Sequence, residues 1–165
     1  MNLLNMSTNI DKSMYENYID EDQNTLLHFW IMKNGCIDMF KLLLKYESDV
    51  NKKNKFNFTP LHVACKYGNI EFAKLLLENG ANKDENAETF SKKYKLTPYY
   101  LACATAHMDC AKLLLDAGAD IKVFDHPNRK SYRDLFDTGA TKCAKQLQKK
   151  GKAKSAKSLV WFRRT

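Results

Sequence analysis

A 23-residue segment occurs twice in this chain of 165 residues, and the repetition limits the folds open to it. Residues 59–81 read TPLHVACKYGNIEFAKLLLENGA, and residues 97–119, 38 positions later, read TPYYLACATAHMDCAKLLLDAGA. A looser copy, TLLHFWIMKNGCIDMFKLLLKYES, begins at residue 25, and a degraded one, SYRDLFDTGATKCAKQL, begins at residue 131. Units of this length bury their apolar faces by stacking on one another, which predicts a solenoid.

Each copy is predicted to form a helix, a turn, a second helix and a loop. In the second copy Thr59 is a suitable N-cap, and Pro60 follows at the first helical position, where its missing N–H costs nothing. Gly68 and Gly80 mark the two helix ends, because glycine tolerates the left-handed conformation found there. Neither helix is long enough to be stable alone.

The segments TPLHVACKYGN and AKLLLENGA together resemble one whole repeat of the ankyrin-repeat family, and the resemblance covers residues 20–148. It implies an all-α solenoid of about four helix-turn-helix repeats with short β-hairpin fingers, the fourth being a polar cap. Residues 1–19 are expected to form an N-terminal extension with a short helix at 13–19. Residues 149–165 are expected to form a basic, disordered tail.

Three departures from the family pattern lead to structural predictions. The first copy has one extra residue and carries Trp30 where later copies have alanine, which suits a terminal repeat. The third copy has Ala106 in place of Gly68, so we expect an altered turn, since alanine in a left-handed conformation costs roughly 1 kcal/mol. The connection from residue 80 to residue 97 is five residues longer than its predecessor, which predicts an elongated finger or a tolerated insertion.

Several side chains that could take part in catalysis or metal binding are interpreted as structural. His28 and His62 occupy the same repeat position, which favours a structural hydrogen bond within or between repeats. Cys65 and Cys103 also match in register beside alanines, where a small buried residue is expected.

No catalytic, metal or cofactor site is predicted. His107 and Cys110 are three residues apart on a helix, and His126 lies in a loop, but neither place supplies a full ligand set. The chain has no GxSxG, HExxH or P-loop motif. We therefore expect no enzyme activity and no small-molecule substrate.

A protein partner is the function that the resemblance implies. In the family, finger tips and first helices line a concave groove, with variable positions before the TPLH motif and late in the first helix. The matching positions of the second and third copies are Lys53, Lys55, Phe56, Phe58, Lys66, Tyr67, Lys93, Tyr94, Leu96 and Thr105.

Lysines interleaved with aromatic residues suit a partner segment that is both acidic and apolar, since exposed aromatic side chains are frequent at binding hot spots. The competing interpretation is that Phe56 and Phe58 only pack against a neighbouring finger. The predicted function is non-catalytic recognition by a monomeric adaptor, targeting or inhibitory subunit.

Positive charge is concentrated at the C-terminus. The chain has a net charge of +8, but residues 1–137 hold 18 basic and 19 acidic residues, whereas residues 138–165 hold nine basic residues and no acid. The body is therefore near neutral, and the basic character belongs to the tail.

The end of the tail, KSLVWF, loosely resembles the basic–x–Val–x–aromatic peptide that docks on protein phosphatase 1, with candidate docking residues Lys157, Val160, Trp161 and Phe162. The alternatives are a solvated tail, contact with nucleic acid or an anionic membrane, and nuclear import.

The expected location is intracellular, cytoplasmic or nuclear. The five cysteines are odd in number and include no CxxC, which is typical of a reducing compartment. The first 20 residues lack a basic segment followed by an apolar one, and no apolar run reaches the length of a membrane helix.

Overall fold

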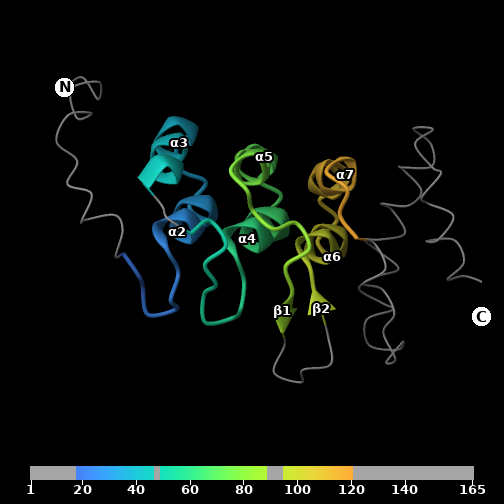
Figure 1. Cartoon of the computed structure of the whole chain (residues 1–165), viewed down its shortest axis with the longest axis horizontal. Coiled ribbons are helices and arrows are strands. Elements are labelled where there is room, and N and C mark those ends of the chain that lie inside the picture. The colour runs from blue at the N-terminus through green and yellow to red at the C-terminus, as the bar shows by residue number, and fades with distance from the viewer. Residues whose placement is uncertain (1–17, 47–48, 89–94, 121–165) are drawn as a thin grey trace, which may run out of the picture.

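Six helices in three stacked pairs dominate the part of the chain that the structure describes (Figure 1). The computed structural model describes residues 18–46, 49–88 and 95–120. The helices are α2 (Leu26–Met32), α3 (Ile37–Tyr46), α4 (Pro60–Tyr67), α5 (Ile70–Glu78), α6 (Pro98–Ala104) and α7 (Met108–Asp116). The first helices of the pairs, α2, α4 and α6, lie side by side as one row, and α3, α5 and α7 form a second row beside it. The predicted all-α repeat solenoid is confirmed.

Threonine begins the first helix of every described pair. The side chain of Thr59 accepts a hydrogen bond from the N–H of His62, and Pro60 starts α4. Thr97 accepts in the same way from the N–H of Tyr100, 3.2 Å away, and Pro98 starts α6. The helix starts predicted from the TP pairs are confirmed.

The core runs along the stack between the two rows of helices. Leu76 and Leu114, from the two LLL triplets of the strong copies, are fully buried, and Leu43 of the first copy is nearly so. The rings of Phe40 and Phe72 meet edge to face, with centroids 4.6 Å apart, and join the first pair to the second. Burial of apolar area across each junction is what stabilises helices this short.

The expected alteration of the turn at Ala106 is wrong. Ala106 adopts a φ of 61°, close to the 72° of Gly68. The N–H of His107 donates to the carbonyl of Ala102 at 2.8 Å, as the N–H of Asn69 donates to Ala64 at 2.9 Å. The local cost of left-handed alanine is about 1 kcal/mol, less than the cost of misplacing α7 against α5 and α6.

The extra residue of the first copy lies in the turn between α2 and α3. Asn34 takes the left-handed position with a φ of 49°, and Cys36 then supplies the carbonyl that opens α3. The indole Nε1–H of Trp30 donates to that Cys36 carbonyl at 2.9 Å. The tryptophan therefore supports the longer turn, and a Cβ added at Gly35 would collide with its ring.

A short antiparallel hairpin forms the base of the finger between the second and third repeats. Strand β1 (Ala87–Glu88) pairs with β2 (Lys95–Leu96) in the register Ala87↔Leu96 and Glu88↔Lys95. The residues between the strands lie outside the described part, so the length of the finger beyond this base remains a prediction.

Several other expectations also fall outside the described residues. These are the fourth repeat, the tail at 149–165 and most of the short helix expected at residues 13–19, whose last two residues are described and lie in no helix. No helix in the part of the chain that the structure describes is long and apolar enough to cross a membrane.

The turn residues give the first testable prediction. Ala106→Gly should raise the free energy of unfolding by about 1 kcal/mol, because glycine adopts positive φ without a Cβ penalty. Gly68→Ala should lower it by roughly 2 kcal/mol, because its new Cβ would also lie 2.4 Å from Nδ1 of His107. Urea unfolding of both variants measures the two changes, and shifts of the same sign would contradict this account.

Candidate functional site

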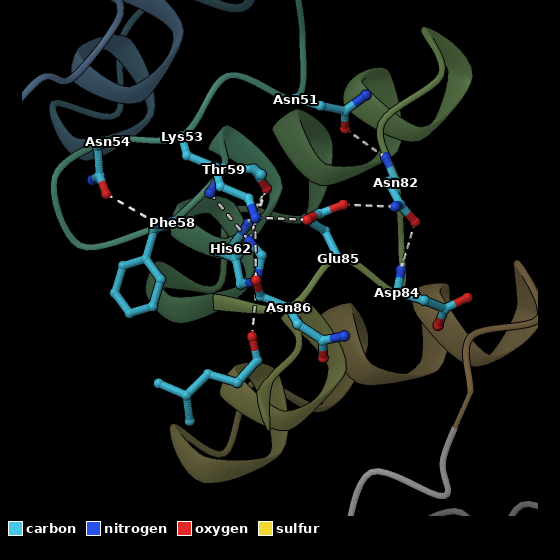
Figure 2. Close-up of polar contacts among 11 residues, drawn as sticks. Asn51, Lys53, Asn54, Phe58, Thr59, His62, Asn82, Asp84, Glu85 and Asn86 are labelled. Atoms are coloured by element: carbon cyan, nitrogen blue, oxygen red, sulfur yellow. Dashed lines mark hydrogen bonds and ion pairs between the residues drawn. The ribbon is translucent and has the colours of Figure 1, made fainter. Parts of the chain in front are cut away.

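A buried imidazole ties each of the first two repeats to the finger that follows it. Nδ1 of His62 lies 3.1 Å from the backbone nitrogen of Thr59, and Nε2 lies 2.9 Å from the carbonyl oxygen of Leu96 (Figure 2). Because a carbonyl only accepts, Nε2 carries the proton and Nδ1 accepts from the Thr59 N–H. The neutral ring thus bridges the start of α4 and the strand β2.

His28 repeats this arrangement one unit earlier. Its Nδ1 lies 3.1 Å from the nitrogen of Thr25, and its Nε2 lies 2.9 Å from the carbonyl oxygen of Phe58. The predicted structural role of both histidines is confirmed. Tyr100 stands at the equivalent position of α6, so the imidazole bridge occurs at the first two junctions of the described stack.

Burial keeps both imidazoles neutral. Neither His28 nor His62 exposes any surface. Burial lowers the pKa of each from 6.5 to about 4, against the opposing effect of the carbonyl that each ring contacts. A positive charge at either position would lose hydration and place an N–H opposite a backbone N–H.

Two finger loops share a conformation that was not predicted from the sequence. The carboxylate of Asp20 accepts from the N–H groups of Asp22 and Asn24, and the carboxamide of Asn54 accepts in the same way two and four residues later. The side-chain nitrogen Nδ2 of Asn54 donates to Oδ1 of Asn24 at 2.8 Å, and this hydrogen bond joins the two finger loops. The signal was an Asp or Asn five residues before Thr25 and Thr59.

A ladder of short polar side chains runs along the base of the fingers and was also missed. Oδ1 of Asn51 accepts from the N–H of Asn82 at 2.7 Å (Figure 2). Oδ1 of Asp84 accepts from the N–H of Asp120 at 2.7 Å. These contacts join each repeat to the next. The signal was an Asp or Asn at matching positions after the second helix of each repeat.

Two of the predicted partner-binding lysines are paired within the fold. Nζ of Lys53 lies 2.7 Å from Oε1 of Glu85, and this hydrogen bond holds the pKa of Glu85 below its usual value. The side chain of Lys55 forms an ion pair with that of Asp22, and the backbone N–H of Lys55 donates to the backbone carbonyl of Asp22 at 2.9 Å. Both lysines therefore connect neighbouring fingers.

Lys66 brings a finger and a helix together. Its Nζ lies 5.8 Å from the ring centroid of Phe58 and 5.7 Å from that of Tyr67. The Phe58 ring stacks on His62 with centroids 5.6 Å apart and is only half-buried. Tyr67 is 50% exposed and Phe56 is 48% exposed, with Lys55 over the Phe56 ring at 5.1 Å.

We use the name finger face for the surface formed by the finger loops and the ends of the first helices. Of the sequence-predicted residues it includes Lys53, Lys55, Phe56, Phe58, Lys66, Tyr67, Leu96 and Thr105. Leu96 is half-buried, and Thr105 is exposed at the end of α6 with its hydroxyl bonded to the Leu101 carbonyl. Lys93, Tyr94, Lys157, Val160, Trp161 and Phe162 lie outside the described residues.

The buried cysteines pack in the core. Cys65 and Cys103 are almost completely buried, as predicted. A side-chain hydrogen bond with Cys110, together with burial, raises the pKa of the Cys65 thiol. Among the residues that the structure describes, no group of three or more His, Cys, Asp or Glu side chains is placed to hold a metal ion.

Comparison with known proteins yields one matching family and several short matches. A family model described as ankyrin repeats in three copies matches residues 3–87 and 27–125. An ankyrin repeat protein of Acanthamoeba polyphaga mimivirus is 33% identical over 75 residues, which cover 46% of this chain and 10% of that protein. A second ankyrin repeat protein of the same virus is 41% identical over 70 residues, 40% of this chain and 43% of that protein.

A regulatory protein of animals also matches. Protein phosphatase 1 regulatory subunit 27 of Homo sapiens is 37% identical over 51 residues, 31% of this chain and 33% of that protein. In each of these three relatives the matched segment spans less than half of the relative's own length.

The buried imidazoles give a prediction about pH. The pKa values of both histidines are lower in the folded chain than in the unfolded one. Their contribution to the free energy of unfolding is therefore fully present above pH 6.5 and falls as the pH drops from 6.5 to about 4. Each histidine should contribute on the order of 3 kcal/mol to this loss. Urea unfolding at several pH values measures the slope.

The double variant His28→Gln and His62→Gln is the matched control, since glutamine can bridge the same donors and acceptors without titrating. It should be less stable at pH 7 and show a flatter dependence on pH. An unchanged slope would assign the acid sensitivity to other groups.

Proposed function

Because the chain belongs to the ankyrin-repeat family, whose repeats are protein-interaction modules, we propose that it is a non-catalytic adaptor, targeting or inhibitory subunit that binds a protein partner on its finger face. The observation that carries this proposal is the exposure of two aromatic side chains, Tyr67 and Phe56, beside lysines in a stack whose other large apolar residues are mostly buried. Exposed aromatic residues next to cations are typical of binding hot spots.

The competing interpretation, that the finger aromatics only pack against the fold, applies to one of the two phenylalanines. Phe58 stacks on the buried His62 ring, and its carbonyl accepts from His28, so it supports the scaffold. Phe56 has about half of its surface exposed and contacts the side chain of Lys55. The proposed binding surface is therefore centred on Phe56, Lys66 and Tyr67.

The double variant Phe56→Ala and Tyr67→Ala should keep the fold and lose partner capture. Both side chains are half exposed, so their removal should change stability by only about 0.5 kcal/mol each, while loss of two hot-spot residues should weaken binding at least a hundredfold. Affinity purification with mass spectrometry, in parallel on wild type and variant, measures the loss.

Ile70→Ala is the matched control for that experiment. Ile70 is a 37% exposed apolar side chain of the same repeat at the start of α5, outside the finger face. This control should retain every partner. Equal capture by wild type and the double variant would refute the assignment of the finger face.

A second candidate function concerns the tail. Its KSLVWF segment resembles a protein phosphatase 1 docking peptide, although Lys157 is one position further from Val160 than that pattern expects. One relative of the repeats is named as a regulatory subunit of the same phosphatase. Together these observations favour a regulatory subunit that binds a phosphatase through its tail and a further protein through its finger face.

Val160→Ala with Phe162→Ala should weaken binding of the full chain to purified protein phosphatase 1 catalytic subunit more than tenfold, because the pattern places its two apolar anchors there. Leu159→Ala, which alters the residue before Val160, should bind normally. Isothermal titration calorimetry measures the affinities.

The alternative for the tail is contact with nucleic acid or an anionic membrane through its lysines. It predicts equal phosphatase binding by both tail variants, and binding to DNA or anionic vesicles that weakens as salt is raised. That pattern would replace the phosphatase proposal. In either case we propose an intracellular, cytoplasmic or nuclear monomer, supported by the four free cysteines among the described residues.

A further inference from the structure

The lysines of the finger face differ in whether they already form an ion pair with a carboxylate of the fold. Lys53 is paired with Glu85 and Lys55 with Asp22, so the charges of these two finger lysines are already matched within the fold. Within the described residues no carboxylate lies within ion-pair distance of Lys33 or Lys66. The positive charge available to a ligand is therefore on the helix side, at the ends of α2 and α4.

Aromatic rings hold both of these lysines in place. Nζ of Lys66 lies between the rings of Phe58 and Tyr67, at 5.8 and 5.7 Å from their centroids. Nζ of Lys33 lies 5.7 Å from the centroid of Phe29. A cation over a ring is oriented but not neutralised, so each ammonium group can still bind a carboxylate at low entropic cost.

The helix ends also change in character along the stack. Met32 and Lys33 end α2, Lys66 and Tyr67 end α4, and the equivalent pair in the third repeat is Ala104 and Thr105. None of these six positions carries an acidic side chain. The first two repeats therefore present a lysine at this place and the third presents small neutral side chains. The two ends of the face differ in charge for this reason.

We propose, on the basis of the partner-binding function above, that the finger face selects a peptide segment carrying acidic side chains opposite Lys33 and Lys66 and an apolar side chain against Tyr67 and Phe56. The carboxylates complete charge-assisted hydrogen bonds with the ring-held ammonium groups. The apolar side chain covers the two half-exposed rings. Lys53 and Lys55, which the sequence pattern predicted to bind the partner, instead connect neighbouring fingers and do not contact the ligand.

A peptide suits this surface better than a nucleic acid strand. A strand requires cations along its whole phosphate backbone. The ends of α2 and α4 offer Lys33 and Lys66, which lie one repeat apart, and the loop before α2 carries the exposed acid Glu21. Isolated carboxylates separated by apolar residues match that distribution of charge.

Selection from a library of random 12-residue peptides displayed on phage, with the immobilised full chain as bait, tests the proposal. Wild type should enrich peptides that combine Asp or Glu with aromatic or aliphatic residues. A Lys66→Glu bait should lose these and enrich peptides with Lys or Arg. A synthetic copy of a selected acidic peptide should bind Lys66→Glu about tenfold more weakly than wild type.

Lys74→Glu is the control bait, because it changes net charge equally at an exposed position of α5 in the same repeat. It should enrich the same acidic peptides as wild type, which separates the finger face from the basic tail that all baits share. Equal loss of acidic peptides in the Lys66 and Lys74 variants would assign selection to general charge and overturn the proposal.

Two further outcomes separate this inference from the function on which it depends. Peptides that require Phe56 and Tyr67 but show no preference for acidic residues would leave the binding function standing and refute the charge selection. Peptides that bind the Phe56→Ala and Tyr67→Ala variant as well as wild type would refute both. Binding of an oligothymidylate that is lost in Lys66→Glu and kept in Lys74→Glu would assign the face to nucleic acid instead.

Discussion

The buried histidine bridge is the interaction on which the rest of the stack depends. One neutral imidazole satisfies a backbone N–H at the start of a helix and a backbone carbonyl in the next finger, and both would otherwise be buried without partners. Because the bridges of His28 and His62 follow the same geometry, the angle between helix and finger is repeated from one unit to the next. The regular spacing of the finger face is a consequence.

How far the sequence predicts this structure depends on whether a feature repeats in register. Thr59 and the leucine triplets recur at the same place in each strong copy, and His62 matches His28 of the first copy, so their roles could be inferred from the sequence. Contacts between fingers could not be inferred in this way, because they join different positions of neighbouring repeats and the repeat pattern does not show which of these positions meet. The Asn51–Asn82 contact and the matching Asp84–Asp120 contact are examples. The left-handed Ala106 was missed for another reason, namely that packing outweighed the local preference of the residue.

The same limit applies to the candidate binding surface. The sequence pattern predicted which positions face a partner, and Tyr67, Phe56 and Lys66 are among them. It treated the lysines as equivalent, whereas the structure pairs Lys53 and Lys55 with acids from neighbouring fingers. Such pairing depends on distances between repeats, which no single repeat contains.

Three contacts fix the base of the finger between the second and third repeats. The pair Ala87↔Leu96 closes the hairpin, the Leu96 carbonyl is held by His62, and Glu85 is held by Lys53. The chain leaves and re-enters the solenoid at two anchored points, so the pitch of the stack does not depend on how many residues join them. Because the entropy of closing a loop grows only slowly with its length, two anchored ends of this kind accept connections of different lengths at a small cost in stability.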